Sequence, residues 1–247
     1  GMAPYGNPDK YDFSRLIRCD GKSIEVDTDL VNTIGLRRYK QDGIGYYFGK
    51  KMVEWLGPKR EGDEIDDPYV HYAACMQKLL EDISLQLIET YLGDILRDTG
   101  KICFAGGVAL NVKLNQRIID LPHVKELFVQ PAASDAGTAI GAATFLANEM
   151  GEKIETLEHV YLGPVYTTEE CIDACKKHSK NPSWEIIGNA PETAARILAE
   201  GSPVAWFQGR MEFGPRALGN RSILGDPSRA GIAERINSQI KYRERWR

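Results

Sequence analysis

Residues 101–111 read KICFAGGVALN, and the order of residue types in this stretch decides the fold class that we predict. The apolar run KICFA has the length of a short buried strand, paired glycines then turn the chain, and a helical stretch follows. The same order recurs in residues 126–150, where ELFVQP precedes a turn of small residues and an Ala/Gly-rich helix. Two such units in succession predict an α/β domain whose ligand lies at the carboxyl ends of its strands.

The residues before this stretch predict one long helix. Asp67 as N-cap and Pro68 at the first helical position open an amphipathic pattern. The pattern continues to about Thr99, and Gly100 ends it. Residues 1–68 contain frequent Gly, Asp and Pro, so only short elements are expected there.

The pattern of apolar and polar residues changes after Gly151, and the change predicts a second domain. Residues 151–166 show neither helical nor alternating periodicity, so we place the boundary there and predict domains of residues 1–155 and 156–247. The elements expected beyond the boundary are a helix in TTEECIDACKKH with a capping box of Thr167 and Glu170, a helix in APETAARILAEG that Pro191 starts and Gly201 ends, and a strand in PVAWF.

Composition and charge limit the class of protein. With 247 residues, 43% of them hydrophobic, the chain can bury a sizeable core, and its net charge of -4 gives no general attraction to nucleic acid or to an anionic membrane. The five cysteines are an odd number at irregular spacing, which favours reduced thiols over a disulfide framework. No apolar run approaches the roughly 18 residues of a membrane span, and no signal peptide opens the chain. We therefore expect a cytoplasmic protein.

Two turns of small residues are candidate ligand sites. Gly106 and Gly107 allow a ligand to approach the peptide groups closely, and Asn111 offers both a donor and an acceptor. The alternative is a tight turn capped by the asparagine. Asp135, at the next strand-to-helix turn, either caps the helix or ligates a hard cation beside a phosphate. Gly137 lets that helix lie close to a ligand or to another helix.

Residues 207–227, FQGRMEFGPRALGNRSILGDP, concentrate positive charge on a bent backbone. Three fork-shaped guanidiniums, suited to phosphate or carboxylate, stand there among glycines, prolines and apolar residues: Arg210, Arg216 and Arg221. We interpret the stretch as an anion-binding loop. The alternative is a solvated loop whose arginines pair with Glu212 and Asp226. The four histidines of the chain lie in no ligand spacing, and we assign them no catalytic role.

AGGVALN, ASDAGTAIGAA and FQGRMEFGPRALGNRSILGDP together resemble motifs of the O-carbamoyltransferases of the nodulation-factor and antibiotic-tailoring type, and the opening GMAPYG resembles a further one. The resemblance covers most of the chain. It implies half of an actin-like ATPase-fold domain, related to the threonylcarbamoyl-transfer enzymes of tRNA modification, followed by the start of a YrdC-like α/β domain. It also implies an enzyme that uses carbamoyl phosphate and ATP, through carbamoyl adenylate, to carbamoylate a hydroxyl of a small-molecule acceptor.

The resemblance implies roles for particular residues. The nucleotide would lie at Gly106, Gly107, Val108, Asn111 and Gly137, and Asp135 would ligate a divalent metal ion, Fe or Mg. Carbamoyl phosphate and ATP would bind to Arg210, Arg216, Arg221 and Ser222, with Arg216 and Arg221 in catalytic roles. The expected partners are carbamoyl phosphate and the hydroxyl acceptor, without nucleic acid or membrane, and a homodimer is left open.

The chain also departs from the family pattern. Members of the family have an H-x-x-x-H metal motif before GMAPYG, and nothing here matches it. The YrdC-like part is expected to be cut short after Arg247, so we expect a piece that is inactive by itself. The alternative from another class is a nucleotide-binding or interaction module that keeps the fold without transfer chemistry. The carbamoyltransferase of hydrogenase maturation would need zinc-finger cysteine pairs, and the sequence has none.

Overall fold

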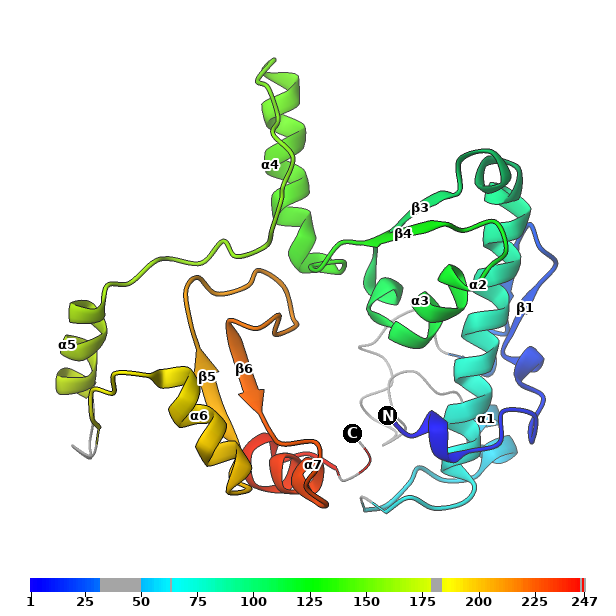
Figure 1. The fold of residues 1–247 in the computed structure, drawn as a ribbon. Coiled ribbons are helices and arrows are strands. Elements are labelled where there is room, and N and C mark those ends of the chain that lie inside the picture. The colour runs from blue at the N-terminus through cyan, green and yellow to red at the C-terminus, as the bar shows by residue number, and fades with distance from the viewer. Residues whose placement is uncertain (32–49, 63, 179–183, 245, 247) are drawn as a thin grey trace. The chain divides into compact units, whose positions relative to one another are not determined.

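The computed structural model describes residues 1–31, 50–62, 64–178, 184–244 and 246. These residues form helices and three two-stranded sheets, so the predicted mixed α/β class is confirmed at this coarse level (Figure 1). The chain divides into two compact units. Unit 1 comprises residues 1–103, 111–128 and 244–247, and unit 2 comprises residues 104–110 and 129–243.

The helices and strands have the following bounds. In the first part of the chain they are β1 Ile17–Cys19, β2 Ile24–Val26, α1 Lys50–Leu56, α2 Tyr69–Thr99, β3 Lys101–Phe104, α3 Val112–Ile119 and β4 Glu126–Val129. In the second part they are α4 Thr138–Glu149, α5 Thr168–His178, α6 Ala190–Ala199, β5 Val204–Phe207, β6 Arg221–Leu224, α7 Ile232–Arg235 and a π-helical turn Ile236–Lys241.

The long helix α2 ends where the sequence predicts and begins differently. Gly100 adopts the left-handed conformation, with φ of 68°, and its backbone N–H donates to the Leu96 carbonyl at 2.8 Å. At the other end Pro68 occupies the cap position, so the prediction of Asp67 as N-cap is wrong. The Asp67 carboxylate instead accepts a hydrogen bond from Lys10 Nζ at 2.9 Å. The Asp67 carboxylate therefore binds Lys10, which is far away in the sequence, and does not cap α2.

Unit 1 is built around an apolar core against α2. Phe13, Leu16 and Leu30 are buried together with Cys75 of α2, and the Phe13 ring meets Trp55 edge-on at 5.5 Å. The described part of residues 1–68 forms only short elements, as expected, and this cluster packs several of them against α2. Residues 32–49 and 63 lie outside the described part. On α3, Leu114 and Ile118 are fully buried, and α3 packs against α2. Each such side chain stabilises the fold by about 1.5–3 kcal/mol.

The two strand–turn–helix units predicted from the sequence are confirmed. β3 leads through a short 3-10 turn, Gly107–Leu110, into α3, and β4 leads through another, Asp135–Gly137, into α4. β3 and β4 are hydrogen-bonded neighbours in one sheet. Both strands end where the chain passes from unit 1 into unit 2. The turns that follow them therefore belong to unit 2.

Unit 2 contains the capping box that the sequence predicts. The Thr167 N–H donates to Glu170 Oε2 at 2.8 Å, and the Glu170 N–H donates to Thr167 Oγ1 at 3.2 Å, so α5 begins as expected. α6 begins at Ala190, with Pro191 in its first turn, because Asn189 Oδ1 accepts from the Glu192 N–H at 3.2 Å. The predicted boundary between residues 155 and 156 stays a prediction.

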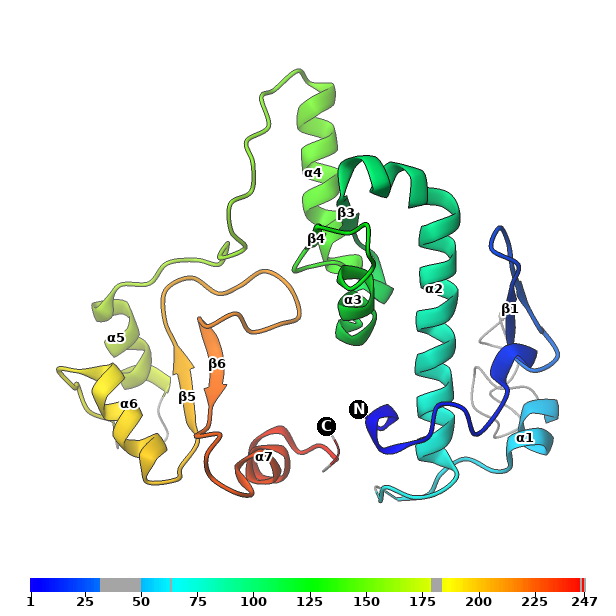
Figure 2. The same ribbon diagram turned by 45° about the vertical axis from the view of Figure 1, so that its right-hand side comes forward.

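A β-hairpin replaces the continuous loop expected for residues 207–227. β5 is the strand predicted in PVAWF, and β6 pairs with it antiparallel, from Val204 opposite Leu224 to Phe207 opposite Arg221. Figure 2 shows the two strands side by side and the long loop that joins them. The loop prediction is wrong for residues 221–224, since pairing with a preceding strand can satisfy backbone groups that no local signal marks.

Candidate anion-binding site

Three segments that are remote in the sequence meet within unit 2. We name them the glycine turn (residues 105–110), the aspartate turn (residues 131–137) and the arginine loop (residues 208–220). The Gly106 N–H donates to the Ala133 carbonyl at 2.6 Å, which joins the glycine turn to the aspartate turn. Arg216 Nη2 lies 3.4 Å from the Leu110 carbonyl, which brings the arginine loop against the glycine turn.

The arginine loop also approaches the aspartate turn closely. Gly214 has a φ of 118°, and a Cβ at this position would lie 2.8 Å from the Pro131 carbonyl oxygen. Only glycine fits both the backbone conformation and the contact. Parts of all three sequence motifs that carry the family resemblance therefore meet in unit 2, whereas Asn111, the last residue of the first motif, belongs to unit 1.

The glycine turn presents open backbone. Gly106 has a φ of 97°, a conformation that favours glycine, and a Cβ built at Gly106 or at Gly107 would meet no atom within 4 Å. The Val108 side chain beside them is 46% exposed. The peptide groups here are accessible to a ligand, and nucleotide binding by these residues stays a prediction.

Asn111 uses its side chain inside the protein. Its Oδ1 accepts from the Leu114 N–H at 3.1 Å and from Gln77 Nε2 at 3.1 Å, while its Nδ2 donates to Gln77 Oε1 at 2.9 Å. Asn111 thus caps α3 and links it to α2 within unit 1. These contacts give the residue a structural role, and its nucleotide role stays a prediction.

Asp135 does not act as a helix cap. Ser134 and Gly137 occupy the cap positions of the two helical segments here, and neither cap has a side-chain hydrogen bond. The exposed Asp135 carboxylate has no hydrogen bond or ion pair with any described residue. Gly137 has a steric reason to be glycine, because its Cβ would lie 2.3 Å from the Ala132 carbonyl oxygen.

The described residues do not form a metal centre by themselves. No group of three His, Cys, Asp or Glu side chains comes together in the part of the chain that the structure covers. Asp135 offers one free carboxylate, so it fits as a single ligand of a divalent ion whose remaining ligands come from elsewhere. Its metal role stays a prediction.

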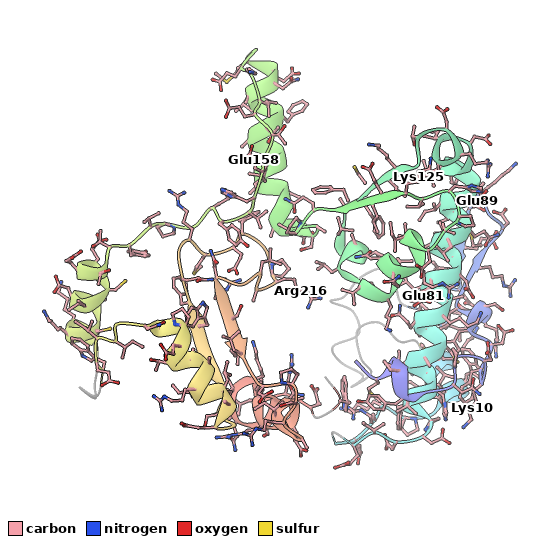
Figure 3. The ribbon with its side chains drawn as sticks, viewed as in Figure 1. Lys10, Glu81, Glu89, Lys125, Glu158 and Arg216 are labelled. Carbon is pink, nitrogen blue, oxygen red and sulfur yellow. The ribbon has the colours of Figure 1, made fainter. Side chains whose placement is uncertain are left out.

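The ion pairs expected of a solvated loop form only in part, because Arg221 pairs with Glu212, at 3.9 Å from Nε to Oε2, while the other two arginines have no acidic partner in the part of the chain that the structure describes. Asp226 pairs with Arg229, at 3.7 Å from Oδ2 to Nε, and not with the three predicted arginines. Arg210 and Arg216 are exposed and form no ion pair among the described residues. Figure 3 shows Arg216 at the end of the arginine loop that lies away from β5 and β6.

The remaining predicted residues of the site lie on β6. Arg221 is partly buried, pairs through its backbone with Phe207, and places Nη2 3.5 Å from the Gly214 carbonyl. Ser222 pairs with Trp206 on β5. A strand holds its backbone more rigidly than a loop, so Arg221 and Ser222 are fixed at the base of the arginine loop.

Glu212 is the residue of the site whose role the sequence interpretation missed. Its side chain is fully buried, and its Oε1 accepts backbone N–H groups from Leu218 at 2.7 Å, Asn220 at 2.7 Å and Arg221 at 3.2 Å. The sequence does contain a signal, since Glu212 is the single acidic residue in the arginine loop. A lone carboxylate among glycines is suited to bind inward-pointing backbone N–H groups.

The local hydrogen bonds keep Glu212 ionised. Burial alone would raise the pKa of the Glu212 carboxyl, but donation from the backbone N–H groups of Leu218, Glu212, Asn220 and Arg221 outweighs it and lowers the pKa to about 2. The arginine loop therefore contains a buried negative charge at neutral pH, and the guanidinium that faces it is that of Arg221. Residues 208–221 keep a net positive charge, because they contain three arginines and one acidic residue.

Comparison with known proteins assigns the chain to a family. The profile described as "Carbamoyltransferase N-terminus" matches residues 31–144, and the profile described as "Carbamoyltransferase C-terminus" matches residues 195–247. The glycine turn and aspartate turn fall in the first match, and the arginine loop falls in the second. The chain belongs to the carbamoyltransferase family.

Curated relatives agree with this assignment. The chain is 33% identical over 257 residues to nodulation protein NolO of Bradyrhizobium diazoefficiens, covering all of this chain and 43% of the relative. It is 28% identical over 248 residues to the 3'-hydroxymethylcephem-O-carbamoyltransferase of Amycolatopsis lactamdurans, covering 98% of this chain and 44% of the relative. An uncharacterized protein of Synechocystis is 36% identical over all of this chain and 41% of its own length. The chain thus spans less than half the length of these relatives.

Proposed function

We propose that this chain is part of an enzyme that transfers a carbamoyl group to a hydroxyl of a small-molecule acceptor. Membership of the carbamoyltransferase family supports the reaction class, and the name of the Amycolatopsis relative supports a hydroxyl as acceptor. The observation that carries the proposal is the arginine loop. Two of its guanidiniums, those of Arg210 and Arg216, have no acidic partner among the described residues, and the loop contacts the two turns that carry the other family motifs.

The donor side of the reaction is the finer part of the proposal. Water would release phosphate from carbamoyl phosphate, and the resulting carbamate would attack the α-phosphorus of ATP to give carbamoyl adenylate and pyrophosphate. The acceptor oxygen would then attack the carbamoyl carbon as AMP leaves and the hydroxyl proton is lost. AMP is a better leaving group than the hydroxide that free carbamate would have to expel, which is the reason for adenylation by ATP. We further propose that the first part of the chain belongs to an actin-like ATPase-fold domain and the second to a YrdC-like domain.

The residues of the site suit binding and orientation of anionic groups. Arg210, Arg216 and Arg221 supply charge-assisted donors that match phosphoryl oxygens in pairs. The backbone at Gly106 and Gly107 is open for close approach of a phosphate or nucleotide. A divalent ion held in part by Asp135 would offset phosphate charge when bound. The contribution of this chain is to hold the reacting groups in a fixed geometry.

The proposal is tested by anion binding to arginine variants. In the protein at its full natural length, Arg216→Ala and Arg221→Ala should each weaken binding of carbamoyl phosphate or ATP by roughly 10- to 150-fold, which corresponds to about 1.5–3 kcal/mol for hydrogen bonds to a charged group. Lysine at either position should restore only part of the affinity, because a point charge does not reproduce the fork. Calorimetry at fixed salt measures the affinities.

The matched control is Arg196→Ala. Arg196 lies on α6 in an exposed ion pair with Glu200 at 3.2 Å, so its loss removes one positive charge without touching the arginine loop. Its affinities should equal those of the unchanged protein. Affinities that are also unchanged in both arginine-loop variants would contradict the proposed role of the loop.

Transfer itself is tested by incubating the protein with carbamoyl phosphate, ATP and candidate hydroxyl acceptors. A mass increase of one carbamoyl group on an acceptor, together with AMP, is the expected result. Nucleotide binding without any transfer in the full-length protein would instead favour a binding module that keeps the fold.

A further inference from the structure

The strongest unassigned feature of the molecule is the buried carboxylate of Glu212. Its Oε1 holds three backbone N–H groups of the arginine loop, whereas its Oε2 is buried and has no hydrogen-bond partner among the described residues. Buried polar atoms are rarely left without a partner, so an unpartnered carboxylate oxygen next to a cation calls for a reason.

The cation that faces this oxygen is Arg221. Its Nε lies 3.9 Å from Glu212 Oε2, while its backbone N–H donates to Oε1 at 3.2 Å. The same carboxylate therefore contacts the base of Arg221 and attracts the inner edge of its guanidinium. The Arg221 side chain remains 39% exposed, which leaves part of the fork accessible to a ligand.

We propose that Glu212 is a positioning residue that sets where the Arg221 guanidinium lies for anion binding. This rests on the proposed function, in which the arginine loop binds a phosphoryl group. The carboxylate closes the loop by joining residue 212 to residues 218–221, and its second oxygen draws the Nε edge inward. The outer edge of the fork is thereby directed toward the ligand.

A carboxylate is needed for this role, and an amide is not equivalent. Glutamine would keep a carbonyl oxygen for the three backbone N–H groups, so it preserves the closed loop. With that oxygen in use, its NH₂ group would face the Arg221 Nε, two donors would meet, and the attraction would be lost. Glu212→Gln thus separates the positioning of Arg221 from the closing of the loop.

The sign of the effect distinguishes positioning from simple electrostatics. Removing a negative charge near an anion site should, by itself, strengthen anion binding. If Glu212 positions Arg221, Glu212→Gln should instead weaken carbamoyl phosphate binding about tenfold, the size of one hydrogen bond to a charged group. Affinity is measured by calorimetry in the full-length protein, with the melting temperature recorded to show that the variant is folded.

A double-mutant cycle tests whether the effect acts through Arg221. In an Arg221→Ala background, Glu212→Gln should cause no further weakening, because the side chain to be positioned is absent. In an Arg216→Ala background, the weakening should remain, since Arg216 contacts Leu110 and not Glu212. Equal weakening in both backgrounds would overturn the proposal, as would unchanged or tighter binding in the single variant.

Glu212→Asp serves as a second variant if the glutamine protein does not fold. It keeps the charge but shortens its reach, so Arg221 should again be misplaced and binding should weaken. A folded aspartate variant with unchanged affinity would overturn the proposal. Failure of the proposed function is distinguishable, because then Arg216→Ala and Arg221→Ala would themselves leave carbamoyl phosphate binding unchanged.

Discussion

Units 1 and 2 bury different kinds of side chain. Unit 1 encloses large apolar residues, including Phe13, Leu16 and Leu114, against its long helix. Among the described residues of unit 2, the buried ones are Ala109, Ala132, Ala133, Val160 and Ala194 with two polar residues, Glu212 and Asn237. Burial of apolar side chains stabilises the fold but does not depend on the direction of a contact. A buried carboxylate instead holds particular N–H groups in place through directional hydrogen bonds.

This difference suggests a division of roles. A core of large aliphatic and aromatic side chains supplies stability to unit 1. A polar arrangement supplies a defined backbone conformation to the arginine loop of unit 2, where the proposed ligand contacts lie. Substitutions in unit 1 should therefore mainly change stability, whereas substitutions in the arginine loop of unit 2 should mainly change ligand binding.

The largest expected effect is on stability in unit 1. Leu114 is fully buried on α3, so Leu114→Ala should lower the free energy of unfolding by about 3 kcal/mol through lost burial and a residual cavity. Denaturant unfolding followed by circular dichroism measures the loss. Val112→Ala is the matched control, because Val112 lies on the same helix and is 69% exposed. A loss of similar size in both variants would remove the contrast between core and surface.

The second effect is a selective response of unit 2 to acid. The pKa of Glu212 is lowered from 4.5 to about 2 in the folded protein, so its ionised form stabilises the folded state above about pH 4.5. That contribution is lost as the pH falls from 4.5 toward 2. Hydrogen exchange should show opening of the arginine loop in this range before opening of α2. Glu212→Gln should abolish the difference, and simultaneous opening in the unchanged protein would contradict the prediction.

The third effect decides between two roles of Asn111. Asn111→Ala should lower stability by about 1 kcal/mol, the usual value of a lost N-cap, and Asn111→Asp should retain most of it because aspartate caps equally well. Aspartate cannot donate to Gln77, and it places a negative charge near any bound nucleotide. Urea unfolding and ATP binding are measured on both variants. If neither variant alters ATP affinity, the residue has only the structural role.

The smallest effect on stability is expected at Asp135. Its exposed carboxylate has no partner among the described residues, so Asp135→Asn should change the free energy of unfolding by less than about 0.5 kcal/mol. If Asp135 ligates a divalent ion, the same variant should weaken metal-dependent binding of ATP. Calorimetry with and without Mg²⁺ distinguishes the outcomes. Identical metal dependence in variant and unchanged protein would remove the predicted ligand role.

Much of the local structure was predictable from the sequence. The strand in KICFA, the end of α2 at Gly100 and the capping box of Thr167 with Glu170 are confirmed, because each depends on neighbours along the chain. Two predictions were wrong, namely Asp67 as the N-cap of α2 and a loop at residues 221–224. The Asp67 carboxylate binds Lys10, and residues 221–224 form a strand because they pair with β5. Neither partner is adjacent in the sequence.

Residue types and their spacing are enough to predict the strand–turn–helix units, the positive charge of residues 207–227 and the motifs that mark the family. These features follow from residue type and spacing, which local backbone preferences convert directly into structure. The contacts that these residues make depend on the tertiary fold. It revealed that Gly214 meets the Pro131 carbonyl and that Glu212 is buried, where it binds backbone N–H groups as well as pairing with Arg221. The physical reason is that burial and close backbone approach depend on segments that meet only after the chain has folded.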